Sequence, residues 1–152
     1  MKITQQHVPL NILLADDDID DRSFFEKAIS EMPMPAILRT VNNGEQLMDY
    51  LAENETNLPD MLFLDLSMPR KTGFECLAEI KESIILKNIP VVMLTTSYTR
   101  GLDLEDNLKT TLVRMGAYDY IRKPIDFEEL KTVVHQTLTR LTERPAQQKA
   151  NL

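Results

Sequence analysis

Four short apolar runs in this chain are each followed directly by residues that can take part in phosphate chemistry. The runs span residues 11–15, 61–64, 91–94 and 118–122, and the residues that follow them are Asp16 with Asp17, Asp65, Thr95, and Lys123. A parallel α/β sheet collects its functional groups just beyond the C-terminal ends of its strands. If the runs are neighbouring parallel strands, three carboxylates, a hydroxyl and an ammonium share one crevice. Such a crevice suits Mg²⁺ and a phosphoryl group, because Mg²⁺ takes carboxylates together with phosphate oxygens.

Helical patterns separate these runs. Apolar residues recur at helical spacing within 24–32, 47–51, 74–84, 103–115 and 126–141, and a further strand is predicted over 36–41. Thr72 and Glu75 have the spacing of a capping box and predict the start of a helix that turns Phe74 and Ile84 inward. Five βα units with right-handed crossovers predict an α/β fold, a doubly wound (βα)5 flavodoxin-like sandwich with parallel sheet order 2-1-3-4-5. In that order the third strand lies beside the first, which brings Asp65 close to the acidic residues after the first strand.

The size and charge of the chain narrow the class of protein. A chain of 152 residues can form one domain with a substantial core, expected over 8–142, followed by a polar tail at 143–152 that frays. A net charge of -7 disfavours nonspecific binding to nucleic acid, which needs clustered basic residues. No apolar stretch approaches the length of a membrane span, no signal-peptide pattern occurs, and the single Cys76 cannot form an internal disulfide. We therefore expect a cytoplasmic protein with no nucleic-acid or membrane partner.

Each polar residue at a strand end also has a plainer interpretation. An aspartate in the position of Asp65 is more often a turn residue, and Thr95 is β-branched and at home in a strand. Most lysines are solvated, although Lys123 precedes a proline and is therefore held on an extended backbone. The chemical interpretation depends on the residues as a set. A carboxylate can attack phosphorus and form an aspartyl phosphate, and nearby cations are needed to keep packed carboxylates ionised.

The acidic run after the first strand is ambiguous in the same way. Asp16 and Asp17 can offer carboxylates to Mg²⁺, or they can cap the next helix and complement its dipole. Without Asp65 the two interpretations are about equally favoured. We assign the rest of the run mainly to helix capping, namely Asp18, Asp20 and Asp21.

Four motifs, taken in order, resemble a known family. They span residues 12–18, 59–69 together with Gly73, 90–97 and 116–124. They closely resemble the receiver domain of two-component response regulators, the CheY-like family, and the resemblance covers about residues 8–141. It implies a phosphorelay protein in which a sensor histidine kinase or a histidine phosphotransfer protein phosphorylates Asp65.

The resemblance also implies a metal site. The family pattern places Mg²⁺ on Asp17, Asp65 and the backbone carbonyl of Ser67, with Asp16 reaching the ion through water. Without the ion, three carboxylates would lie close together, so at least one of them should have a raised pKa.

Three more residues match positions that read the phosphoryl group. Thr95 and Lys123 match the residues that hold it, and Tyr120 matches one that changes rotamer when Thr95 moves. This implies a switchable surface formed by the fourth helix, fifth strand and fifth helix. The expected partners are a separate output protein and a second copy of the chain through that surface, because about ten residues after the last helix are too few for an output domain.

There is one alternative function, and the sequence departs from the receiver pattern in one segment. The alternative is a small Mg²⁺-dependent phosphatase or phosphotransferase of haloacid-dehalogenase type, but such enzymes usually carry an Asp-x-Asp nucleophile on the first strand. Here Asp65 is on the third strand and Ser67 stands two residues later, so we expect a signalling protein rather than an enzyme. The departure is that residues 95–123 are longer than in a typical receiver by about half a dozen residues. We place the addition around 98–107, as a tolerated loop or as part of the partner surface.

Overall fold

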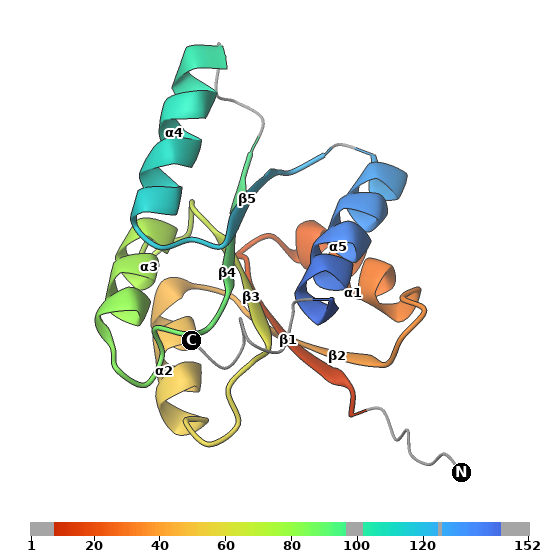
Figure 1. The fold of residues 1–152 in the computed structure, drawn as a ribbon, viewed down its shortest axis with the longest axis horizontal. Coiled ribbons are helices and arrows are strands. Elements are labelled where there is room, and N and C mark those ends of the chain that lie inside the picture. The colour runs from red at the N-terminus through yellow and green to blue at the C-terminus, as the bar shows by residue number, and fades with distance from the viewer. Residues whose placement is uncertain (1–7, 97–101, 125, 144–152) are drawn as a thin grey trace.

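The computed structural model describes residues 8–96, 102–124 and 126–143, and in them five strands alternate with five helices (Figure 1). The strands are β1 (Leu10–Ala15), β2 (Ala36–Val41), β3 (Met61–Asp65), β4 (Val91–Thr95) and β5 (Asp119–Arg122). The helices are α1 (Ile19–Ser30), α2 (Gly44–Glu53), α3 (Gly73–Glu82), α4 (Leu102–Arg114) and α5 (Phe127–Thr142). All strands pair in parallel in the order β2-β1-β3-β4-β5. The predicted fold class and sheet order are therefore confirmed.

The sheet separates two layers of helices. Helices α1 and α5 cover one face, and α2, α3 and α4 cover the other (Figure 1). Alternate residues of β3 belong to different cores: Phe63 packs with α1 and α5, where its ring lies 5.0 Å from that of Phe25, while Leu64 packs with α2 and α3. Every residue of β3 and β4 is buried. Burial on both faces explains why these strands are continuous apolar runs instead of alternating ones.

The register of the sheet brings the ends of the central strands to one edge. Asp65 ends β3 opposite Leu94 of β4, and Thr95 ends β4 opposite Arg122 of β5. The backbone N–H of Lys123 then donates to the carbonyl of Thr95 at 2.8 Å, which extends the pairing by one step. The polar residues that follow the strands are therefore gathered at the C-terminal edge of the sheet.

The helix starts follow the capping signals in the sequence. Thr72 accepts a hydrogen bond from the Glu75 N–H, and the Glu75 side chain accepts one from the Thr72 N–H, so the predicted capping box is present. Asn43 caps α2 and Asp126 caps α5. Asp18 caps α1 by accepting from two backbone N–H groups of the first turn. Each cap satisfies donors that the first turn of a helix leaves unpaired.

The predicted inward face of α3 is wrong at both ends. Phe74 is 38% exposed, and Ile84 is 84% exposed and lies beyond the last residue of the helix. The first turn of α3 stands against the end of β3, since a Cβ added at Gly73 would lie 2.3 Å from the carbonyl oxygen of Asp65. Phe74 follows in that turn at the end of the strand and belongs to neither of the two cores.

Two predicted segments reach beyond the described residues. In the added segment at 98–107, residues 98–101 lie outside the described ranges, whereas 102–107 form the first turns of α4 and are helix rather than loop. Most of the tail predicted at 143–152 also lies outside these ranges. None of the described helices is both long and apolar enough to cross a bilayer.

Candidate functional site

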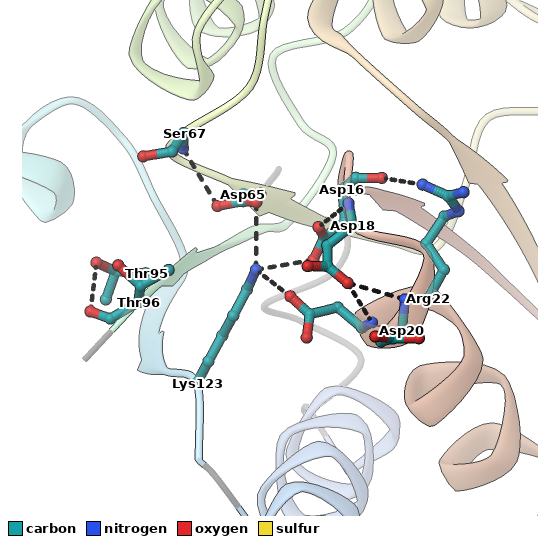
Figure 2. A network of polar contacts seen from close by, with 10 residues as sticks. Asp16, Asp18, Asp20, Arg22, Asp65, Ser67, Thr95, Thr96 and Lys123 are labelled. Carbon is teal, nitrogen blue, oxygen red and sulfur yellow. Dashed lines mark hydrogen bonds and ion pairs between the residues drawn. The ribbon is translucent and has the colours of Figure 1, made fainter. Parts of the chain in front are cut away.

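Polar side chains from three strands meet at the C-terminal edge of the sheet (Figure 2). Asp16 follows β1, Asp65 ends β3, and Lys123 follows β5 and extends toward both of them. Asp16 is 0% exposed and Asp65 is 3% exposed, so two carboxylates lie almost wholly out of water. Buried charges are stable only when paired or bound to a metal.

The ammonium of Lys123 lies among three carboxylates. Its Nζ is 2.9 Å from Oδ2 of Asp16, 2.9 Å from Oδ2 of Asp21 and 3.2 Å from Oδ2 of Asp65. It donates hydrogen bonds to Asp21 and to Asp65. The protein thus places a single cation where several negative charges converge, which offsets their repulsion.

Asp65 is fixed by contacts to both of its carboxylate oxygens. Oδ1 accepts a hydrogen bond from the Ser67 N–H at 3.2 Å, and Oδ2 accepts one from Lys123 at 3.2 Å. The backbone after Asp65 is fixed as well, because the Gly73 N–H donates to the carbonyl of Leu66 at 3.0 Å. Since a side chain at Gly73 would collide with the Asp65 backbone, glycine is what allows α3 to approach the acidic residue this closely.

Asp16 is held by hydrogen bonds to its backbone carbonyl and to one of its two carboxylate oxygens. The carbonyl of Asp16 accepts from the Arg22 side chain at 2.9 Å, and Oδ1 accepts from the Asp18 N–H at 3.0 Å (Figure 2). Its buried Oδ2 lies 2.9 Å from Nζ of Lys123 and forms an ion pair with it. This second oxygen is therefore directed at a positive charge inside the site.

Burial perturbs the ionisation of the whole cluster. Burial raises the pKa of Asp65 to about 6, with Asp16 adding to the shift and Lys123 opposing it. Burial also raises the pKa of Asp16, against the Asp18 N–H and Lys123. For Lys123, burial lowers the pKa, but its contacts with Asp21 and Asp16 outweigh that effect and leave the pKa raised. A raised carboxylate pKa was predicted from crowding, yet the principal cause is loss of water rather than mutual repulsion.

Three carboxylates are close enough to share a cation. Oxygens of Asp16, Asp17 and Asp65 all lie within 4.8 Å of one another. Asp17 is exposed, so an ion there would keep access to water, as Mg²⁺ prefers. This donor set of hard carboxylate oxygens fits a divalent cation of this kind.

The two residues predicted to act as a switch lie on neighbouring strands. Thr95 is buried, and its hydroxyl donates to the carbonyl of Thr96 at 3.3 Å instead of to Asp65. Tyr120 is half-buried on β5 and packs against the core shared with α3 and α4. The structure therefore brings Asp65 and Lys123 into contact, whereas the Thr95 hydroxyl is directed elsewhere.

Sequence reasoning missed the part played by Asp21. It was assigned to helix capping, but the cap itself is Asp18, and the Asp21 side chain pairs with Lys123 across 102 residues of chain. A signal was present, because an aspartate in the first turn of a helix that starts at the sheet edge can turn back toward that edge. The spacing alone could not show which way the side chain points.

Comparison with known proteins gives consistent matches. A family model described as the response regulator receiver domain matches residues 12–135. The chain is 33% identical over 131 residues to the probable methanogenesis regulatory protein FilR2 of Methanothrix harundinacea, covering 84% of this chain and 81% of that protein.

Two solved structures extend the comparison. The phosphorylated cyanobacterial phytochrome response regulator RcpA matches with a TM-score of 0.76 and 31% identity, covering 90% of this chain and 96% of RcpA. The Mn²⁺-bound form of response regulator Rcp1 matches with a TM-score of 0.71 and 30% identity, covering 84% and 91%. The Rcp1 protein that this chain resembles in sequence comes from Synechocystis. These matches do not favour the alternative of a haloacid-dehalogenase-type enzyme.

Proposed function

The chain belongs to the response regulator receiver domain family of two-component signalling proteins, and from this we propose that it accepts a phosphoryl group on Asp65. The donor is a phosphohistidine of a sensor histidine kinase or of a histidine phosphotransfer protein. The observation that carries the proposal is the position of Asp65, which is buried at the end of β3, bonded to Lys123 and close to Asp16 and Asp17. The relative RcpA was solved in a phosphorylated form.

The transfer forms one bond and breaks another. A carboxylate oxygen of Asp65 attacks phosphorus, the P–N bond of the phosphohistidine breaks, and the imidazole nitrogen leaves with the electron pair. Attack requires the ionised carboxylate, and Lys123 favours that form while offsetting charge on the transferring group. Catalysis of this kind depends mainly on position and electrostatics.

The metal proposed for this site is Mg²⁺. Asp17, Asp65 and the backbone carbonyl of Ser67 would hold it, with Asp16 reaching it through water. When bound, the ion supplies positive charge beside the phosphoryl oxygens. The acidic cluster and the Mn²⁺-bound form of Rcp1 support a divalent cation here.

The proposed output is a change at the surface formed by α4, β5 and α5. New phosphoryl oxygens would attract the Thr95 hydroxyl away from Thr96, and Tyr120 would repack into the space that this movement leaves. The weak 3.3 Å contact of Thr95 and the partial exposure of Tyr120 support such a rearrangement. The partners proposed for that surface are a separate output protein and a second copy of the chain.

The direct test is labelling with acetyl phosphate and Mg²⁺, followed by intact mass. We expect one added phosphoryl group on the wild type and none on Asp65→Asn, which is nearly isosteric. Asp49→Asn, which removes an exposed carboxylate from α2, is the matched control and should label normally. Undiminished labelling of Asp65→Asn would show that the phosphoryl group is carried elsewhere.

A further inference from the structure

Among the described residues, Asp21 is the one carboxylate in contact with Lys123 that does not belong to the acidic cluster. The oxygens that could share a cation come from Asp16, Asp17 and Asp65, whereas Asp21 lies on the first turn of α1 with its side chain 36% exposed. Its Oδ2 is nevertheless as close to the ammonium as that of Asp16, at 2.9 Å. Lys123 of the site is therefore paired with Asp21, a residue that is not among the candidate metal ligands.

We propose that Asp21 is a positioning residue for Lys123, holding its ammonium beside the site when Mg²⁺ occupies the acidic cluster and competing for it with the phosphoryl group. This inference rests on the proposed function. It assigns to Asp21 a role that neither its position in the first turn of α1 nor its place in the sequence indicates.

The first step of the argument is competition for one ammonium. The ammonium carries one positive charge, and three carboxylates lie within 3.2 Å of it, so the three negative charges share one cation. A cation held by Asp17 and Asp65, with Asp16 reaching it through water, would repel the ammonium from both Asp16 and Asp65. Asp21 is then the remaining partner for Lys123, and the contact between them becomes stronger as the other two are lost.

Space and anchoring allow this shift. A cavity of about 30 Å³ lies beside Lys123, lined among others by Asp21, Phe24 and Pro124, so the side chain is not packed tightly on that side. The backbone of Asp21 is fixed because its N–H donates to Oδ1 of Asp18 at 3.1 Å. Asp21 is therefore an anchored acceptor at the rim of the site.

The second step concerns the phosphoryl group. Lys123 already contacts Asp21 and Asp65 together, so a phosphoryl oxygen on Asp65 and the Asp21 carboxylate would compete for the single positive charge of the ammonium. Removing the Asp21 charge should therefore have two opposite effects: Mg²⁺ should bind more weakly, and the phosphoryl group should hold Lys123 more tightly. A role in folding alone would not change the two affinities in opposite directions.

The experiment compares Asp21→Asn with Asp20→Asn in the full chain. Asp20 is exposed in the same turn and, like Asp21, donates its backbone N–H to Asp18, so it controls for loss of one negative charge. Calorimetric titration should show Mg²⁺ binding about three- to tenfold weaker in Asp21→Asn than in Asp20→Asn. At saturating Mg²⁺, beryllofluoride, a phosphoryl mimic, should bind Asp21→Asn more tightly by a similar factor.

Both differences should vanish when Lys123 is replaced by alanine, because the effect of Asp21 acts through the ammonium. If they persist in the Lys123→Ala background, or if Asp21→Asn matches Asp20→Asn, the inference is wrong while the proposed function stands. If Asp17→Ala binds Mg²⁺ as tightly as the wild type, the metal lies elsewhere, and the inference is overturned together with the metal site on which it depends.

Discussion

Replacing Asp65 by asparagine should stabilise the protein above neutral pH, although the substitution removes its proposed activity. Burial raises the pKa of Asp65 from its ordinary value of 3.8 to about 6. Between those two values the folded protein binds a proton that the unfolded chain does not. The free energy of unfolding therefore falls as pH rises through this window, and it stays lower above it.

The size of the effect follows from the shift. A difference of about two pKa units corresponds to about 3 kcal/mol. Asparagine does not titrate, but its NH₂ group must face either the Lys123 ammonium or the Ser67 N–H, both of which are donors. We therefore expect Asp65→Asn to be about 1–3 kcal/mol more stable than the wild type at pH 8. The advantage should be lost as pH falls from about 6 to 4. Asp16, whose pKa is also raised by burial, adds a pH dependence of its own to the stability of both proteins.

Urea and thermal unfolding monitored by circular dichroism between pH 4.5 and 8 would measure this difference. For a domain of this size, 1 kcal/mol corresponds to about 2–4 °C in Tm. Asp49→Asn should show no such pH-dependent gain, because that carboxylate is exposed. Mg²⁺ should stabilise the wild type more than Asp65→Asn. A variant that is less stable at pH 8, or whose advantage grows on acidification, would refute the claim that Asp65 is a buried, destabilised charge.

Four further substitutions test the site. Asp17→Ala should bind Mg²⁺ at least about tenfold more weakly in a calorimetric titration; unchanged affinity would place the ion elsewhere. Lys123→Ala should remain folded by circular dichroism but respond poorly to phosphorylation, and a wild-type response would remove it from the mechanism. Thr95→Ala should accept phosphate yet lack the phosphate-induced spectral changes around Tyr120; preserved changes would contradict the relay. Gly73→Ala should lose about 1–3 kcal/mol of stability in urea, because its Cβ would lie 2.3 Å from the Asp65 carbonyl oxygen; wild-type stability would contradict the close approach of α3.

The sequence predicted most reliably what depends on local pattern. The apolar runs of β3 and β4 are buried on both faces, so their composition marks them as strands, and Thr72 with Glu75 marks the start of α3 through local hydrogen bonds. The sheet order then followed from rules of connection. These features require no knowledge of side-chain rotamers.

The sequence could not predict the direction in which side chains point at the edge of the sheet. Phe74 fits the helical spacing of a buried residue, yet the first turn of α3 stands at the end of β3 and leaves Phe74 exposed. Asp21 fits the composition of a capping segment, yet its carboxylate turns toward Lys123. Both outcomes depend on where a helix end stands relative to the strands, and spacing along the chain does not encode that position.

The contacts of Lys123 also determine when the site exists during synthesis. The ammonium reaches Asp65 across 58 residues and Asp21 across 102. A nascent chain that already contains Asp65 lacks its cation until β5 has left the ribosome and added itself to the edge of the sheet. An incomplete chain therefore displays the proposed acceptor without the ammonium beside it, and the cluster is completed only with the last strand.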